Sequence, residues 1–363
     1  MSLTAYQTLG RSGLRVSPLC LGGMTLGDDW KWGANAQESE KIINQFIELG
    51  GNFIDTSNVY TNGHSEKIIG DVIGRQSAIR TGMVIGTKFG GNIFPGNPNG
   101  GGGGAKAIFE SVNNSLRRLQ TDYIDLLWIH QWDWNTPMEE TMRTLNNLVN
   151  TGKVRYIGVC YAPSWKIAQA QTMAILKDWT PFVGLQIEYS LLERTIEDEL
   201  KPMGLELGLG VVPWSPLKGG LLSGKYNREN NGKVPGSRMD ANGRAATLGE
   251  KELKILDKLK EIAETHQSSQ ADIALAWVMS RAGVTSTIIG VRNLEQLNAN
   301  CRAADIKLSK EEIIALDELS APPATFVSAY RPYSQMFHHG GIEVNGVKPP
   351  ALPLTVDMVP GKY

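Results

Sequence analysis

The chain has 363 residues, of which 41% are hydrophobic and 20% are charged, and its formal net charge is −1. This composition is typical of a soluble globular protein, and the balanced charge excludes a general electrostatic attraction to nucleic acid or to an anionic membrane. The sequence has no apolar run long enough to cross a membrane, and residues 1–17 lack the charged and apolar regions of a signal peptide.

Three cysteines, Cys20, Cys160 and Cys301, lie far apart in the sequence. They form neither the close pairs of a metal site nor the dense pattern of a disulfide-rich secreted protein. We therefore expect reduced thiols, a cytoplasmic protein and no metal site.

Eight short and almost wholly apolar runs predict buried parallel strands. In chain order the predicted strands are Leu19–Leu21, Phe53–Asp55, Val84–Thr87, Ile124–Ile129, Tyr156–Val159, Val183–Ile187, Val211–Pro213 and Thr287–Ile289.

Amphipathic segments between these runs predict helices. Residues 37–49 carry apolar side chains on one face and are followed by two glycines, which favour a helix end there. The segment Thr136-Pro137-Met138-Glu139 predicts a capping box with proline at the first helical position, and Gly152 is expected to end that helix. Two further helices are predicted over residues 251–265 and 271–281.

This alternation predicts one α/β domain over residues 1–363, a (β/α)8 TIM barrel. An open doubly wound sheet would require a G-x-G-x-x-G turn after the first strand, where the chain has Leu21-Gly22-Gly23-Met24. Long loops at 90–104 and 218–250 follow the third and seventh strands, on the face where barrel enzymes carry their sites. We expect the five-glycine run of the first loop to be flexible, and the aromatic tail, residues 322–363, to pack over the barrel.

Four polar residues lie at or just after the ends of predicted strands: Asp55, Tyr60, Lys88 and His130. Each one alone is more often a solvated strand end or part of a structural ion pair. A barrel brings these ends to one mouth, so the four residues together predict a carboxylate, a phenol, an ammonium and an imidazole in one site, a set suited to carbonyl reduction.

Hydride addition to a carbonyl creates an alkoxide that needs a proton. A tyrosine can supply it, but its ordinary pKa of about 10 is high for transfer in both directions. We expect Lys88 to lower the pKa of Tyr60 and Asp55 to hold the lysine charged. His130 would donate a hydrogen bond to the carbonyl oxygen.

At these residues the sequence resembles the aldo-keto reductase family, over residues 9–319. Residues 51–60, GNFIDTSNVY, resemble the family motif that contains D-T-A-x-x-Y, and Ser65-Glu66 and Gly70 continue it. Residues 116–126 precede His130 and Asp133 as in the family. The segment 214–217, WSPL, is closest to the bacterial and potassium-channel β-subunit branches. The resemblance implies that Tyr60 is the proton donor, that Lys88 and Asp55 tune it, and that His130 orients the substrate.

The resemblance also implies a nicotinamide cofactor. Gln186 would bind its carboxamide, Trp214 would stack on its ring, and Arg292 would suit a ribose 2′-phosphate, which favours NADPH with NADH as the alternative. In place of the family's usual Ser-Asn, Glu-Asn and Ser-Arg pairs the chain has Cys160-Tyr161, Ala299-Asn300 and Gly104-Ala105. The implied cofactor-binding residues are Met24, Asp55, Cys160, Tyr161, Gln186, Trp214, Ser215, Pro216, Leu217, Gly219, Lys225, Gly290, Arg292, Gln296 and Asn300.

Tryptophans in the loops after strands one and four predict an aromatic wall for a flat or bulky apolar substrate. Simple packing between loops is the alternative. The predicted substrate-binding residues are Trp30, Trp32, Tyr60, His130 and Trp132.

The function predicted from these residues is NAD(P)H-dependent interconversion of carbonyl compounds and alcohols. The alternative is an accessory subunit that binds NADPH, senses redox state and turns over little. A metal-dependent barrel hydrolase is a third hypothesis. It is disfavoured because such a site needs several histidine or aspartate ligands at strand ends besides His130 and Asp133, and the chain has only five histidines. The expected partner is a small-molecule substrate, with no nucleic acid and no membrane; the oligomeric state stays open.

Overall fold

The computed structural model of the protein describes residues 2–230, 232, 234, 235 and 248–353. The chain divides into two compact units, Met1–Ala321 and Pro322–Tyr363. The first unit contains all the strands of the predicted barrel. Packing of the tail over the barrel stays a prediction.

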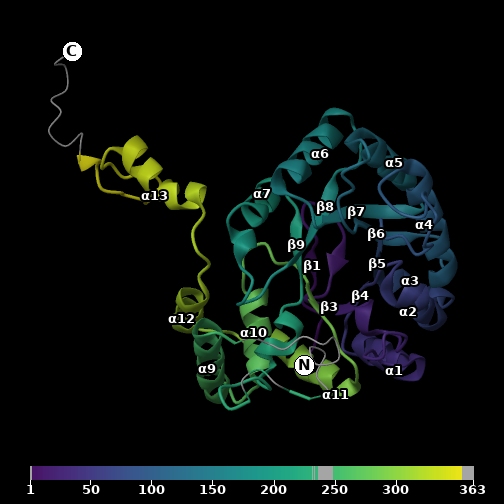
Figure 1. Ribbon diagram of the computed structural model, residues 1–363, viewed down its shortest axis with the longest axis horizontal. Helices are drawn as coiled ribbons and strands as arrows, with labels where there is room; N and C mark the ends of the chain where they lie inside the picture. The colour runs from purple at the N-terminus through teal and green to yellow at the C-terminus, as the bar shows by residue number, and fades with distance from the viewer. Residues whose placement is uncertain (1, 231, 233, 236–247, 354–363) are drawn as a thin grey trace. The chain divides into compact units, whose positions relative to one another are not determined.

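Eight parallel strands form one sheet in the order β10-β3-β4-β5-β6-β7-β8-β9, with helices around its outside (Figure 1). The sheet closes because Val211 of β9 donates to the carbonyl of Gly283 and accepts from the amide of Thr285, both just before β10. The strands are β3 Leu19–Gly22, β4 Phe53–Asp55, β5 Val84–Phe89, β6 Ile124–Ile129, β7 Val154–Cys160, β8 Phe182–Glu188, β9 Gly210–Trp214 and β10 Thr287–Ile289. The (β/α)8 prediction is confirmed.

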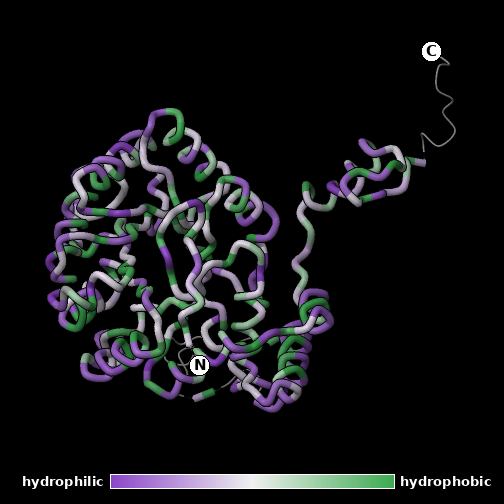
Figure 2. The backbone as a smooth tube through the Cα atoms, turned by 180° about the vertical axis from the view of Figure 1, so that it is seen from behind, coloured by the Kyte–Doolittle hydropathy of each residue, from purple (hydrophilic) through white to green (hydrophobic). Residues whose placement is uncertain are grey.

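Most of the outer helices are amphipathic, so that one face packs on the barrel and the other faces solvent. Figure 2 shows this as alternating green and purple along their coils. The helices of the first unit are α1 Ala36–Glu48, α2 His64–Ile69, α3 Ser77–Gly82, α4 Ala105–Leu119, α5 Met138–Asn150, α6 Ser164–Leu176, α7 Leu200–Glu206, α9 Glu250–Thr265, α10 Gln270–Met279, α11 Leu294–Cys301 and α12 Lys310–Ser320. Among the described residues, no helix is long and apolar enough to cross a membrane.

Trp128 of β6 fills the middle of the barrel and is fully buried. It fits because two neighbouring strands place glycines, Gly158 and Gly184, against its ring. An N-terminal hairpin, β1 Gln7–Thr8 and β2 Arg15–Val16, adds buried apolar side chains to the same interior cluster. The sequence did not predict this hairpin, whose two-residue strands are too short for a periodic signal.

Helix α5 begins differently from the prediction. Pro137 is its N-cap rather than its first helical residue, and no side chain caps the helix. The hydroxyl of Thr136 donates instead to Asp133, over 2.6 Å, so the predicted capping box does not form. The predicted end of the helix is confirmed, since Gly152 follows it with φ of +74°.

The second unit contains helix α13, Phe326–His339, with Pro332 inside it. No residue of this helix is buried within the described chain, and Phe326 and Phe337 are among its exposed aromatic side chains. Residues 236–247 of the predicted polar loop and residues 354–363 of the tail lie outside the described residues.

Candidate active site

The carboxyl ends of β4, β5, β6 and β8 bring together polar side chains that are far apart in sequence. Asp55 is the last residue of β4, Lys88 lies in β5, and Gln186 lies in β8. Tyr60 begins a short 3-10 turn, Tyr60–Gly63, after β4, and His130 follows β6. The parallel register of the strands therefore assembles the residues that the sequence singled out.

Lys88 and Asp55 form an ion pair at the centre of this group. Both side chains are almost fully buried, the ammonium donates to the Asp55 carboxylate, and it also donates to the carbonyl of Thr56 over 2.7 Å. The other carboxylate oxygen of Asp55 accepts from the Gln186 amide over 2.9 Å. Burial alone would lower the pKa of Lys88, but the charges of Asp55 and Tyr60 raise it above its ordinary value. Lys88 therefore stays an ammonium at neutral pH.

Tyr60 lies directly beside this ammonium, since the Lys88 Nζ atom is 4.7 Å from the centre of its ring. Burial raises the pKa of the Tyr60 phenol, Lys88 lowers it, and Asp55 raises it again. The net direction is upward, so the expectation of a lowered pKa is wrong. Lys88 acts in the expected sense but offsets only part of the burial. At neutral pH the phenol carries its proton.

His130 also lies beside Tyr60, with the two rings edge to face and their centres 5.9 Å apart. Burial and then the charge of Lys88 lower the pKa of His130 to about 3. Its Nδ1 atom lies 3.2 Å from the hydroxyl of Ser57. The ring is therefore neutral near pH 7, and Ser57, which the sequence did not single out, orients it.

A cavity of about 530 Å³ opens above these residues. Most of the residues predicted to bind cofactor line it, together with Trp32, Tyr60 and His130. Seven lining residues were missed from the sequence, mostly small or apolar residues with no chemical signal of their own: Gly22, Thr25, Gly220, Ser223, Ala271, Ile288 and Ile289.

Four predicted residues do not line this cavity. Lys88 and Cys160 lie buried beneath it. Trp132 is only 8% exposed and belongs to the hydrophobic core. Trp30 packs on Trp32, with ring centres 5.7 Å apart.

Tyr161 lines the cavity between two of the other aromatic rings. Its ring centre is 6.2 Å from that of His130 and 5.5 Å from that of Trp214. Its φ is +40°, a conformation that a bulky residue rarely adopts. The side chain is half-exposed, so an aromatic surface stands beside His130.

The far end of the cavity suits an anion. Lys225 and Arg292 both line it, and burial together with the nearby charge of Arg292 lowers the pKa of Lys225. Two cations that line the same cavity gain from an anion placed between them. These donors fit the phosphate groups of a dinucleotide.

No group of three or more histidine, cysteine or acidic side chains within the described ranges could hold a metal ion. The buried charges Lys88 and Asp55 are instead paired with each other.

Comparison with known proteins supports a specific family. The sequence model of the Aldo/keto reductase family matches residues 18–321. A putative aryl-alcohol dehydrogenase of Saccharomyces cerevisiae is 38% identical over 85% of this chain and 84% of its own length. A norsolorinic acid reductase of Aspergillus flavus is 36% identical over 85% of this chain and 78% of its own. An aryl-alcohol dehydrogenase [NADP(+)] of Phanerodontia chrysosporium is 35% identical over 84% of this chain and 83% of its own.

Proposed function

The chain belongs to the aldo/keto reductase family, and from this premise we propose that it reduces aldehydes or ketones to alcohols, or catalyses the reverse reaction, with NADP(H). One observation carries the proposal. A protonated tyrosine, Tyr60, lies beside both a buried ammonium, Lys88, and a neutral imidazole, His130, and lines a cavity of about 530 Å³.

Tyr60 would serve as the general acid. Its raised pKa keeps the phenol protonated at neutral pH, ready to donate to an alkoxide oxygen. The phenolate left behind would be stabilised by the Lys88 ammonium beside it, and Asp55 and the Thr56 carbonyl hold that ammonium in place. The bound nicotinamide would supply the hydride for reduction or accept it in oxidation.

His130 would position the substrate oxygen. A neutral imidazole carries one N–H, and a hydrogen bond from Ser57 to Nδ1 would leave that proton on Nε2. The Nε2–H group would then donate to the carbonyl oxygen without adding a charge to the site. A donor prepared in this way stabilises the charge that develops on the oxygen.

We assign the cofactor as NADP(H) rather than NAD(H). Arg292 and Lys225 form a cationic end of the cavity, and a guanidinium binds a phosphate through two parallel hydrogen bonds. One relative carries NADP(+) in its name. Gln186, which bonds Asp55, and Trp214, which packs beside Tyr161, line the same cavity and would hold the carboxamide and the ring.

The substrate class that fits best is an aromatic aldehyde, ketone or alcohol. Trp32 and Tyr161 present aromatic surface in the same cavity as Tyr60 and His130, and flat rings pack well on such walls. Two relatives are named as aryl-alcohol dehydrogenases and a third as a norsolorinic acid reductase.

The decisive experiment measures NADPH consumption with a panel of aromatic and aliphatic carbonyl compounds. We expect turnover with aromatic members and a loss of about 100-fold to 10,000-fold in kcat for Tyr60→Phe, with the NADPH Kd unchanged. Tyr6→Phe serves as the control, because it removes an exposed phenolic hydroxyl that only donates a hydrogen bond to the Gly50 carbonyl. Tight NADPH binding without turnover on any member would favour the accessory-subunit alternative instead.

A further inference from the structure

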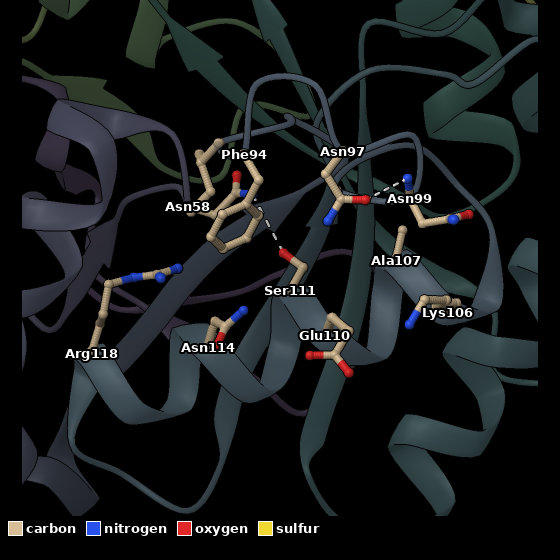
Figure 3. Close-up of a pocket in the computed structure, with 12 residues that line it drawn as sticks. Asn58, Phe94, Asn97, Asn99, Lys106, Ala107, Glu110, Ser111, Asn114 and Arg118 are labelled. Carbon is tan, nitrogen blue, oxygen red and sulfur yellow. Dashed lines mark hydrogen bonds between the residues drawn. The ribbon is translucent and has the colours of Figure 1, made fainter.

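A second cavity, of about 310 Å³, lies between the loop after β5 and helix α4 (Figure 3). It shares no lining residue with the larger cavity that holds Tyr60 and His130. Its volume is at the lower end of the range for small-molecule sites. Ten of its twelve lining residues are labelled in Figure 3: Asn58, Phe94, Asn97, Asn99, Lys106, Ala107, Glu110, Ser111, Asn114 and Arg118.

The loop that covers this cavity is folded by specific contacts. The side chain of Asn92 accepts from the Phe94 amide over 2.8 Å and donates to the Asn97 carbonyl over 2.9 Å. A Cβ atom at Gly101 would lie within 3.0 Å of both Asn92 and the Gly90 carbonyl. The five-glycine run, expected to be a flexible segment, therefore provides the close approach that this hydrogen-bonded loop requires.

The opposite wall is one stripe of helix α4. Lys106, Glu110, Asn114 and Arg118 follow one another at intervals of four residues and share a face. Between the walls, Asn58 donates to the Gly91 carbonyl over 2.9 Å and to the Ser111 hydroxyl over 3.4 Å. The two walls are thus joined at the base of the cavity.

One cationic side chain from helix α4 also lines this space. In Figure 3 the guanidinium of Arg118 extends toward the region beneath the Phe94 ring. Its Nη2 atom is buried without a hydrogen-bond partner among the described residues, while its Nε atom donates to buried Glu66 over 2.6 Å. Nη2 itself is enclosed by protein, so a ligand oxygen would meet the partly exposed remainder of this side chain.

The charges of the cavity are already balanced. Arg118 is paired with Glu66, and Lys106 lies one helical turn from Glu110. An anionic ligand would therefore find no net attraction. The amide NH2 groups of Asn97, Asn99 and Asn114 can donate to hydroxyl oxygens, and each amide oxygen can accept two hydrogen bonds, of which those of Asn97 and Asn114 already use one.

We propose that this cavity is a second ligand site, which binds a neutral polyhydroxylated molecule of monosaccharide or cyclitol size. Hydroxyl groups would bond to the Asn97, Asn114 and Arg118 side chains, and the C–H face of the ring would pack on the half-exposed ring of Phe94. For so small a ligand the Kd is expected to be on the order of 1 mM.

The test uses the full chain without nicotinamide cofactor and two probes, methyl α-D-glucopyranoside and myo-inositol. Neither has a carbonyl group, so neither can be reduced at Tyr60. Titration followed by calorimetry or ligand-observed NMR is expected to show saturable binding. The double variant Asn97→Ala/Asn114→Ala should weaken it at least tenfold. Asn113→Ala, on the same helix but outside the cavity lining, should leave it unchanged, and so should Tyr60→Phe.

Several outcomes would overturn the proposal. One is that neither probe saturates the protein up to about 100 mM. Another is that the wild type and the double variant bind the probes equally. A third is that the cavity binds benzoate, an anionic comparator, more tightly than either probe. Since the readout is binding without cofactor, its failure would leave the proposed reductase activity standing. A reductase that fails to turn over would equally leave polyol binding in place.

Discussion

The Nζ atom of Lys88 lies 4.7 Å from the centre of the Tyr60 ring, and both side chains are largely withdrawn from solvent. Water exclusion and a neighbouring cation act on the phenol in opposite directions. Burial favours the neutral phenol and the ammonium favours the phenolate. Burial prevails in the free protein, so the lysine acts mainly by stabilising the phenolate formed after proton transfer.

This balance determines how carbonyl reduction should depend on pH. Reduction needs the protonated phenol, and the pKa of Tyr60 is raised above about 10. Activity is therefore present below that pKa and is lost only as the pH rises through it. His130, with a pKa of about 3, stays neutral across this range. We expect kcat/KM for reduction to be flat from about pH 5 to pH 9, and oxidation to speed up toward alkaline pH.

Steady-state kinetics at matched ionic strength would check this profile. A fall in reduction between about pH 6 and pH 8 would show that another group, or a lowered pKa of Tyr60, controls the step. Lys88→Met, once its fold is verified by circular dichroism, should move the alkaline fall to still higher pH, because the ammonium that lowers the pKa of Tyr60 is gone.

Removing the guanidinium of Arg292 should change cofactor choice. Hydrogen bonds to charged groups contribute about 1.5–3 kcal/mol, and about 1.4 kcal/mol corresponds to tenfold in Kd. Arg292→Ala is therefore expected to raise the Kd for NADPH by about 10-fold to 100-fold and the Kd for NADH by less than about threefold. Fluorescence titration would measure both, with exposed Arg75→Ala as the control. Equal weakening for the two cofactors would remove Arg292 from the 2′-phosphate site.

Gly158 should be indispensable for the packing of the barrel interior. A Cβ atom there would overlap the ring of Trp128, and the Gly184 carbonyl stands 3.0 Å away on the other side. Overpacking of a core typically costs about 1–3 kcal/mol, so Gly158→Ala should lower the midpoint of urea unfolding. Gly82→Ala is the matched control, since a Cβ atom at that position meets no atom within 4 Å. Similar midpoints for the two variants would show that Trp128 shifts freely.

The strands of the barrel were predictable because each is a nearly continuous apolar run, and the observed strands include every predicted one. Asp55, Lys88 and His130 were recognisable because charged or polar residues that close such runs must lie at the mouth of a closed sheet. Their spatial grouping followed from topology alone. The N-terminal hairpin was missed because Leu9 and Val16 enter the barrel interior from strands of only two residues.

Other features depend on the environment created by the fold. The direction in which the Tyr60 pKa shifts depends on the balance between burial, which raises it, and the charge of Lys88, which lowers it. The sequence does not show how deeply the phenol is buried. The glycines at 100–104 look like low complexity in sequence, and only the close approach of Asn92 shows their purpose. Trp132 appeared to be a wall of the substrate site, but its side chain faces the core.

Tyr161 occupies a position where the family usually has asparagine, and its location in the structure predicts an effect on substrate preference. Its ring lies between those of His130 and Trp214 in the cavity, beside the position where His130 would hold a carbonyl oxygen. An aromatic substrate can stack on this ring, and such pairs contribute about 0.5–1.5 kcal/mol beyond their buried area. A short aliphatic aldehyde gains little from it.

Tyr161→Asn is therefore expected to raise the KM for benzaldehyde-type substrates by about threefold to tenfold, while kcat/KM for butanal changes less than about twofold. Tyr161→Phe keeps the ring without its hydroxyl and should retain the aromatic preference. A parallel loss for both substrate classes in Tyr161→Asn, accompanied by weaker NADPH binding, would contradict a role at the substrate. It would place Tyr161 at the nicotinamide instead, as its position next to Cys160 first implied. Initial rates and NADPH titrations on the wild type and the two variants would decide between these roles. If Tyr161 contacts the substrate, Tyr161→Asn changes the KM for aromatic substrates more than for butanal and leaves the Kd for NADPH unchanged.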